Sequence, residues 1–171
     1  MDFSELNRSR YSCRSFSDRK IDDELLNSVL KEGLIAPTAK NNQPFRIYIL
    51  DSEEAIKKVD EVTSCRYKAK TVLLFTYKKD EEWVSPLDEG ITSGIQDASI
   101  VATTIMLKAK DAGLDTCWVC YFENRKLKKL LNLEESEECV LLMPIGYASA
   151  SASPSPRHYE KRDFNELVKK L

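Results

Sequence analysis

The stretch between residues 91 and 112 constrains the fold more than any other part of the sequence. Apolar side chains recur in it at helical spacing, and several of them are small. They are Ile95, Ala98, Val101, Ala102, Ile105, Met106 and Ala109. Gly113 follows at the usual position after a helix. Because small side chains let a helix approach its neighbours closely, the sequence predicts a tightly packed helix over residues 91–112.

Strands and further helices alternate around this element. Apolar, β-rich runs predict strands at residues 45–50, 71–77, 116–122 and 139–145. Apolar periodicity predicts helices at residues 22–34, 52–62 and 124–131, with a short one near the N-terminus. Asp22 is placed as an N-cap, and Pro37 stops the helix that follows it. Residues 38–44 and 78–90 have loop composition, so the chain as a whole mixes α and β structure.

Length and charge limit the class of protein. A chain of 171 residues, 42% of them apolar, fits one domain over residues 1–171 that buries about 70% of its unfolded surface. The 26 Lys and Arg against 28 Asp and Glu give a net charge of −2, which argues against nucleic acid or anionic lipid as a partner. The longest apolar runs fall short of the ~20 residues that span a bilayer, and the start MDFSELNRSR has no signal-peptide core. We therefore expect a cytoplasmic protein with no membrane partner.

Scarce residue types exclude several kinds of site. His158 is the only histidine, so a His-rich metal site is excluded and we expect no metal. The five glycines do not form a P-loop or a GxGxxG turn. The five cysteines are an odd number and scattered, which is typical of reduced thiols. With a single histidine in the tail, no triad for nucleophilic catalysis can be assembled, and the catalytic residues stay unassigned.

Cys117 and Cys120 form a CxxC motif, but they lie in a predicted strand. Residues three apart in a strand point to opposite faces and are separated by roughly 10 Å. That separation exceeds the Cα distance of about 7 Å that a disulfide tolerates. A dithiol oxidoreductase is therefore disfavoured. Trp118, between the two cysteines, is by itself more typical of a core residue.

Arg10, Ser12 and Arg14 alternate along a predicted extended segment, so their side chains project to one side. Two guanidinium groups and a hydroxyl on one side can bind a phosphate group. The competing interpretation, which the spacing alone favours, is an arginine-rich edge in contact with water. Arg157 can add a third cation, although it too is by itself typical of a surface residue.

The C-terminal residues 148–171 differ in character from the rest. Residues 148–156 are a Ser/Ala/Pro stretch that cannot bury a core, and an amphipathic end with Phe164, Leu167, Val168 and Leu171 follows. An apolar end beyond a linker requires a surface to pack on. That surface belongs either to the same domain or to a second subunit, which this C-terminal arm would embrace.

Four segments, in order, resemble the FMN-dependent nitroreductase family. RYSCRSF at residues 10–16 resembles its RRSxRxF start, and APTAKNNQPF at residues 36–45 resembles its APSAxNxQPW loop. DASIVATTIMLKAKDAGLDTCW at residues 97–118 resembles its central helix and GLGTCW strand. PIGYASASASPSPR at residues 144–157 resembles its PIGYPxxxPxPR tail. The four segments together extend across most of the chain.

The resemblance implies an α+β fold with a central mixed or antiparallel sheet flanked by helices, and a homodimer with FMN at the subunit interface. Residues expected to hold the phosphate and ribityl chain of FMN are Arg10, Ser12, Arg14 and Arg157, and Tyr11 is expected to be cofactor-binding as well. Those expected to approach the flavin ring from the second subunit are Pro37, Thr38, Ala39, Asn41 and Gln43. Those expected along the other side of the ring are Trp118, Val119 and Cys120. Flavin N5 would carry the chemistry, aided by a backbone N–H near Cys120.

The implied activity is transfer of electrons from NADH or NADPH to a nitroaromatic, a quinone or a similar small acceptor in a ping-pong cycle. Departures from the family pattern keep other hypotheses open. Cys120 and Tyr121 stand where members often have two glycines, Ser155 where a basic residue is common, and Thr104 where asparagine is usual. The chain is also short, with only residues 78–96 available for the pocket-shaping insertion. The alternative is a flavin-binding carrier or redox sensor without turnover; an anion-binding interaction domain ranks lower.

Overall fold

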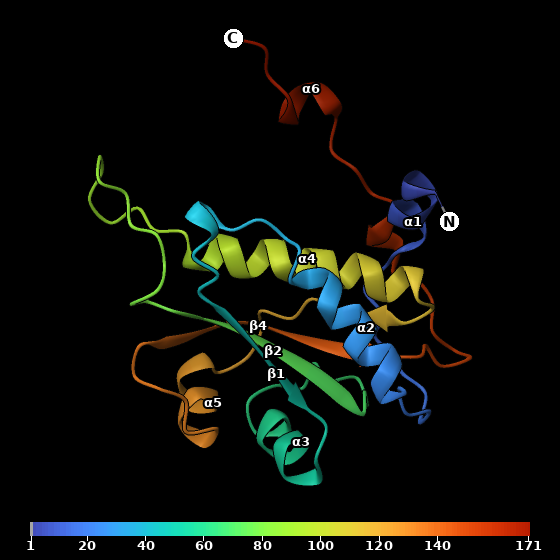
Figure 1. Ribbon diagram of the computed structural model, residues 1–171. Coiled ribbons are helices and arrows are strands. Elements are labelled where there is room, and N and C mark those ends of the chain that lie inside the picture. Colours follow the sequence, from blue (N-terminus) through green and yellow to red (C-terminus); the bar gives the residue numbers. More distant parts are fainter. Residues whose placement is uncertain (1) are drawn as a thin grey trace.

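The computed structural model describes residues 2–171, which form a three-layer α+β fold (Figure 1). The helices are α1 (Phe3–Ser9), α2 (Asp23–Gly33), α3 (Glu53–Asp60), α4 (Gly94–Asp111), α5 (Asn124–Leu130) and α6 (Phe164–Leu167). The strands are β1 (Phe45–Leu50), β2 (Thr71–Lys78), β3 (Asp115–Thr116) and β4 (Glu137–Gly146). Two short 3-10 turns, η1 (Ala39–Asn41) and η2 (Pro156–His158), complete the elements. Helices α2 and α4 cover one face of the sheet, and α3 and α5 cover the other.

The sheet has the strand order β1-β2-β4-β3, and all its pairings are antiparallel. The expected flanked sheet is confirmed in its antiparallel form. Parallel pairing is limited, in the residues that the structure describes, to an isolated bridge between Ser12 and Thr116. Strand β2 is central and buried from Thr71 to Tyr77, as the apolar run predicts for a strand covered on both faces.

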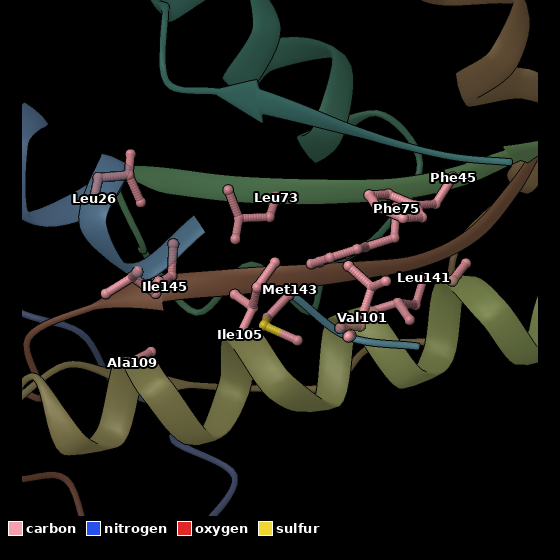
Figure 2. Packing of buried hydrophobic residues seen from close by; sticks show 14 of the residues in the cluster. Leu26, Phe45, Leu73, Phe75, Val101, Ile105, Ala109, Leu141, Met143 and Ile145 are labelled. Carbon is pink, nitrogen blue, oxygen red and sulfur yellow. The ribbon is translucent and has the colours of Figure 1, made fainter. Parts of the chain in front are cut away.

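Each face of the sheet carries its own hydrophobic cluster because alternate strand residues point to opposite sides. Leu73, Phe75 and Met143 face α4, as Figure 2 shows. Val72, Leu74 and Leu142 face α3 and α5. The central strands are therefore fixed in register, since a shift by one residue would exchange the two faces.

The sequence signals at the helix ends are confirmed. The Asp22 carboxylate accepts hydrogen bonds from the backbone N–H groups of Glu24 and Leu25 at the start of α2. The Ser52 hydroxyl accepts one from Ala55 N at 3.1 Å at the start of α3. Helix α4 runs over most of the predicted interval and packs its small side chains on the sheet (Figure 2).

The predicted strand over residues 116–122 is wrong in its extent. Strand β3 ends at Thr116, although residues up to Val119 stay in register with β4, where Val119 and Leu142 exchange two hydrogen bonds. Between them, Cys117 N donates to Pro144 O at 3.1 Å, and no bond can return because proline has no N–H. The ladder is interrupted there, and the chain turns away after Val119.

The C-terminal residues leave the sheet as the Ser/Ala/Pro composition predicts. Ala148 bridges to Phe16, and η2 follows beside α1. Helix α6 then stands away from the sheet (Figure 1), and its apolar residues Phe164, Leu167 and Val168 are exposed. Within residues 2–171, no helix is long and apolar enough to cross a membrane.

Candidate functional site

A cationic pocket of about 300 Å³ lies where the N-terminal segment meets the C-terminal tail. Its lining residues are Arg10, Ser12, Arg14, Ser155, Arg157, His158 and Lys161. The structure therefore brings the alternating Arg10, Ser12 and Arg14 together with the distant Arg157, the four residues that the resemblance groups around a phosphate. Ser155, His158 and Lys161 are lining residues that the sequence did not assign to the site.

Backbone pairing holds the two sides of this pocket in place. Cys13 N donates to Thr116 O at 2.9 Å, which fixes the N-terminal segment beside β3. On the tail side, Ser149 N donates to Ser15 O at 3.0 Å, and the two serine hydroxyls lie 2.7 Å apart. Because Cys13 is fully buried, its neighbours Ser12 and Arg14 point outward into the pocket.

The pocket contains cations without carboxylates. Arg10, Arg14, Arg157 and Lys161 have no ion-pair partner within residues 2–171, and none of the lining residues is acidic. Asp115, the acid near Tyr11, is paired with Lys110 at 2.9 Å. Cations and hydroxyls around an acid-free hollow match the hydrogen-bonding needs of a phosphate monoester.

Tyr11 does not line this pocket. Its ring lies 5.4 Å from the Lys110 ammonium, at the end of α4. Burial, with a contribution from the Asp115 charge, raises the pKa of the Tyr11 hydroxyl to about 12. The Tyr11 side chain packs against the buried cluster of Cys13, Phe16 and Ala69.

Arg14 extends the site toward residues 117–120. A hydrogen bond with Tyr67 is the main cause that lowers the pKa of the Cys65 thiol, and the Arg14 charge contributes as well. The Arg14 charge also lowers the pKa of the Cys117 thiol, but burial of that thiol has the larger effect and raises its pKa to about 11. Arg14 therefore lines the cationic pocket and also acts electrostatically on two nearby thiols.

That segment alternates between the core and the surface. Cys117 and Val119 are buried, whereas Cys120 is exposed, and the Trp118 indole N–H donates to the Cys120 sulfur at 3.3 Å. The two cysteines of the CxxC motif are free thiols with opposite exposure, in agreement with the strand argument. Both backbone groups of Val119 are used by Leu142. Trp118 and Cys120 therefore supply the surface of this segment.

The loop over residues 37–43 lies at the start of α4 and has a backbone suited to presenting amides. Lys40, Asn41 and Gln43 have positive φ angles, and Gln43 N donates to the Thr38 hydroxyl at 3.1 Å. The side chains of Asn41 and Gln43 are exposed, as is Pro37. The Gln43 amide nitrogen donates to the Asn41 carbonyl oxygen at 3.3 Å, so the loop presents two exposed amide side chains, of which Gln43 is bonded to the loop backbone.

Asp97 anchors this loop and was not predicted as a site residue. Its carboxylate is buried and accepts from Ala39 N at 2.9 Å and from the Ser93 hydroxyl at 2.7 Å. The sequence does contain a sign of this role, because Asp97 is the one charged residue between Gly94 and Leu107 and lies at a position that faces the core. Its partner Ala39 is far away in sequence, so the spacing of residues did not reveal the bond.

The loop and the cationic pocket lie at opposite ends of α4 (Figure 1). A helix of 18 residues is about 27 Å long. One chain therefore does not bring residues 37–43 to Arg10, Ser12, Arg14 and Arg157.

The outer side of α4 carries no charge over most of its length. Between Gly94 and Leu107 the one charged residue is Asp97, which is buried. The exposed residues include Ile95 and Ile100, and a shallow groove is lined by Ser99, Ile100, Thr103 and Thr104. An uncharged helix face of this kind is typical of protein–protein contacts.

The fold and the pocket define an α+β protein whose site suits a phosphorylated small molecule. The family description "Nitroreductase family" matches residues 8–70 and 66–147, which is most of the chain. The chain belongs to the nitroreductase family, whose members are oxidoreductases.

Similar proteins cover almost the whole chain. A nitroreductase family protein from Clostridium difficile 630 is 34% identical, with a TM-score of 0.92, and the match covers 99% of this chain and 98% of that one. MhqN of Bacillus subtilis strain 168, a proposed NAD(P)H nitroreductase, is 25% identical over 203 residues, with 98% of each chain covered. A protein from Exiguobacterium sibiricum 255-15, crystallised in complex with FMN, is 20% identical with a TM-score of 0.85, and the match covers 100% and 98% of the two chains.

Proposed function

We propose that this protein is an FMN-dependent oxidoreductase that takes electrons from NADH or NADPH and passes them to a nitroaromatic, a quinone or a similar small acceptor. The acid-free cationic pocket in a chain of this family is the observation that carries the proposal. The FMN complex of the Exiguobacterium protein and the nitroreductase name of MhqN support the cofactor and the reaction class.

The cationic pocket fits the phosphate end of FMN. Arg10, Arg14 and Arg157 supply charge, and Ser12 supplies a hydroxyl on the same side. Charge-assisted hydrogen bonds from guanidinium groups to phosphate are among the strongest that a protein surface offers. Tyr11 contributes indirectly, because its packing against Cys13 and Phe16 and its contact with Lys110 hold the backbone between Arg10 and Ser12.

The ring end of FMN requires a second copy of the chain. Residues Pro37, Thr38, Ala39, Asn41 and Gln43 lie about one α4 length away from the pocket of their own chain. In a homodimer formed through the uncharged face of α4, this loop reaches the pocket of the partner, and the exposed apolar residues of α6 pack on the partner as an arm. Each site is then built from two subunits.

Bound FMN supplies hydride transfer at its N5 atom, and the protein supplies position and polarity. Trp118 and Cys120, on the exposed side of residues 117–120, border the ring, and Val119 holds this border against β4. Asn41 and Gln43 present amide groups to its polar edge. Donor and acceptor then use the same space above the ring in turn, as a ping-pong cycle requires.

The decisive experiment removes two cations of the pocket. We expect the Arg14→Ala, Arg157→Ala double variant to lose bound FMN, measured by absorbance of the purified protein and by flavin titration, because the phosphate loses two charge-assisted partners. The Arg125→Ala, Arg162→Ala double variant removes two exposed arginines outside the pocket and serves as the control. Unchanged FMN affinity in the first variant would refute the phosphate assignment.

A flavin carrier or redox sensor without turnover is the second candidate. Cys120 and Tyr121 favour it, because Tyr121 is highly exposed beside the proposed ring position and narrows the space for a substrate. Anaerobic stopped-flow mixing with NADPH separates the two candidates. Rapid bleaching of the flavin absorbance, followed by recovery with a nitroaromatic or quinone, supports the enzyme, and persistent colour supports the carrier.

A further inference from the structure

Lys161 lines the cationic pocket although no sequence motif includes it. It follows η2, the turn that carries Arg157 and His158 into the same pocket. Its ammonium group donates to the carbonyl oxygens of His158 and Glu160. These two backbone contacts hold the end of a long side chain at the edge of the pocket.

This arrangement leaves Lys161 equipped to bind an anion. An ammonium group has three N–H donors, and the two carbonyls use two of them. Within the described part of the chain, Lys161 has no carboxylate partner, whereas the neighbouring Arg162 is paired with Glu166 at 3.0 Å. Since the side chain is already held, ordering it on binding costs little additional entropy.

The charge of the ligand fits this additional cation. A phosphate monoester carries about −1.5 to −2 at pH 7 and has three acceptor oxygens. Arg10, Arg14 and Arg157 approach it from the N-terminal segment and from η2, and Ser155 on the tail contributes only a hydroxyl. Lys161 supplies a positive charge on the tail side, where Ser155 does not.

We infer that Lys161 is a binding residue for the phosphate group of FMN, completing a cluster of four cations with Arg10, Arg14 and Arg157. The inference rests on the proposed function, since it assigns one more residue to that cofactor site. It extends the part of the C-terminal tail that binds the cofactor from Arg157 to Lys161.

The test compares FMN with riboflavin, which has the same ring and polyol but no phosphate. Flavin-free wild-type protein and the Lys161→Gln variant are titrated with each, and the quenching of flavin fluorescence is followed. We expect the Kd for FMN to rise about 10-fold at low ionic strength, because one charge-assisted contact is lost. The Kd for riboflavin should not change.

Two further variants exclude indirect effects. Lys169→Gln changes a tail lysine that also donates to a backbone carbonyl, of Asn165 at 2.7 Å, but lies outside the pocket, so its FMN affinity should equal that of wild type. Ser155 makes no side-chain cap for η2, so Ser155→Lys can be introduced without loss of a bond. Added to Lys161→Gln, it should restore FMN affinity by returning a cation to the same pocket.

The possible results separate this inference from the proposed function. Unchanged FMN affinity in Lys161→Gln, or an equal loss for FMN and riboflavin, would overturn the role of Lys161 in phosphate binding. An increased KM for NADPH, but not for NADH, with unchanged FMN affinity would assign Lys161 to the donor and would overturn it too. Wild-type protein that binds neither flavin would instead refute the proposed function.

Discussion

At the scale of single residues, Asp97 links the central helix to the loop that we place at the flavin ring. Its carboxylate is 2% exposed and satisfies two donors, the backbone N–H of Ala39 and the hydroxyl of Ser93. The Ser93 hydroxyl in turn accepts from Trp83 N at 3.2 Å. One side chain thus fixes the loop at residues 37–43 and the chain entering α4.

We expect Asp97→Ala to lower the free energy of unfolding by about 3 kcal/mol, because it leaves a buried N–H and a buried hydroxyl without their charged acceptor. Urea denaturation measures this loss. Asp111→Ala, on the same helix, is the matched control, since Asp111 makes only a surface pair with Lys108, and its effect should stay within about 1 kcal/mol. Equal losses of unfolding free energy in both variants would mean that the buried hydrogen bonds of Asp97 stabilise the protein no more than a surface ion pair does.

The placement of side chains was predictable where it depended on neighbouring residues in the sequence. The alternation of Arg10, Ser12 and Arg14 indicated one shared direction, and the three side chains do line one pocket. Lys161 was not predictable, because its place depends on how the tail returns across the N-terminal segment. Asp97 was missed for the same physical reason, since its partner Ala39 is brought to it by tertiary folding.

At the scale of elements, the contact between α2 and α4 depends on one glycine. A Cβ atom at Gly33 would lie 2.5 Å from Cγ1 and 2.6 Å from Cδ1 of Ile105. Moving α4 away would separate it from the sheet, where Ile105 packs beside Leu73 and Met143 (Figure 2), and moving α2 away would expose its own buried Leu26 and Val29. The close approach that small residues allow is therefore realised at this helix pair.

Gly33→Ala should destabilise the protein by about 1–3 kcal/mol through overpacking, despite the better helix propensity of alanine. Thermal or urea unfolding measures the change. In the Ile105→Ala background the same substitution should cost less, because the clashing atoms are absent, and this coupling is the diagnostic result. Ser28→Ala, on the exposed side of α2, is the control. A purely additive double variant would contradict the steric explanation.

The sequence predicted most elements well and failed at one sheet edge. Strands β1, β2 and β4 and helices α2, α3, α4 and α5 lie within a few residues of their predicted positions, because their apolar periods are strong. The strand expected at residues 116–122 ends early because of a residue in the neighbouring strand β4. Pro144 of β4 lacks the N–H that would bond back to Cys117, and no pattern within residues 116–122 contains that information.

At the scale of the whole molecule, our proposal of a second subunit rests on the separation between residues 37–43 and the cationic pocket, the two half-sites of the proposed flavin site. The resemblance predicted residues of both half-sites, but only the fold shows that α4 lies between them (Figure 1). In the proposed homodimer, the helix that forms the core on one side presents its uncharged face to the partner on the other. In this arrangement dimer formation and cofactor binding are coupled, since a separated chain lacks the part of the ring site that residues 37–43 of the partner supply.

This coupling is testable with one charge on α4. We expect Ile100→Glu to convert the proposed dimer to a monomer in sedimentation analysis, because a carboxylate would be buried in an apolar contact without a partner. FMN affinity, measured by fluorescence titration, should fall in the same variant although Ile100 lies outside the cationic pocket. The fall should be largest at low protein concentration, where the remaining dimer dissociates.

The matched control is Ile49→Glu on β1. Ile49 is 40% exposed and Ile100 is 41% exposed, so both substitutions introduce the same charge at equally accessible isoleucines. Ile49 lies on a strand of the sheet, whereas Ile100 lies on the outer face of α4. Ile49→Glu should therefore leave the oligomer mass in sedimentation and the FMN affinity unchanged. A monomeric Ile100→Glu variant that binds FMN as tightly as wild type would show that one chain holds the whole site, and it would remove residues 37–43 of a second subunit from the proposed flavin site.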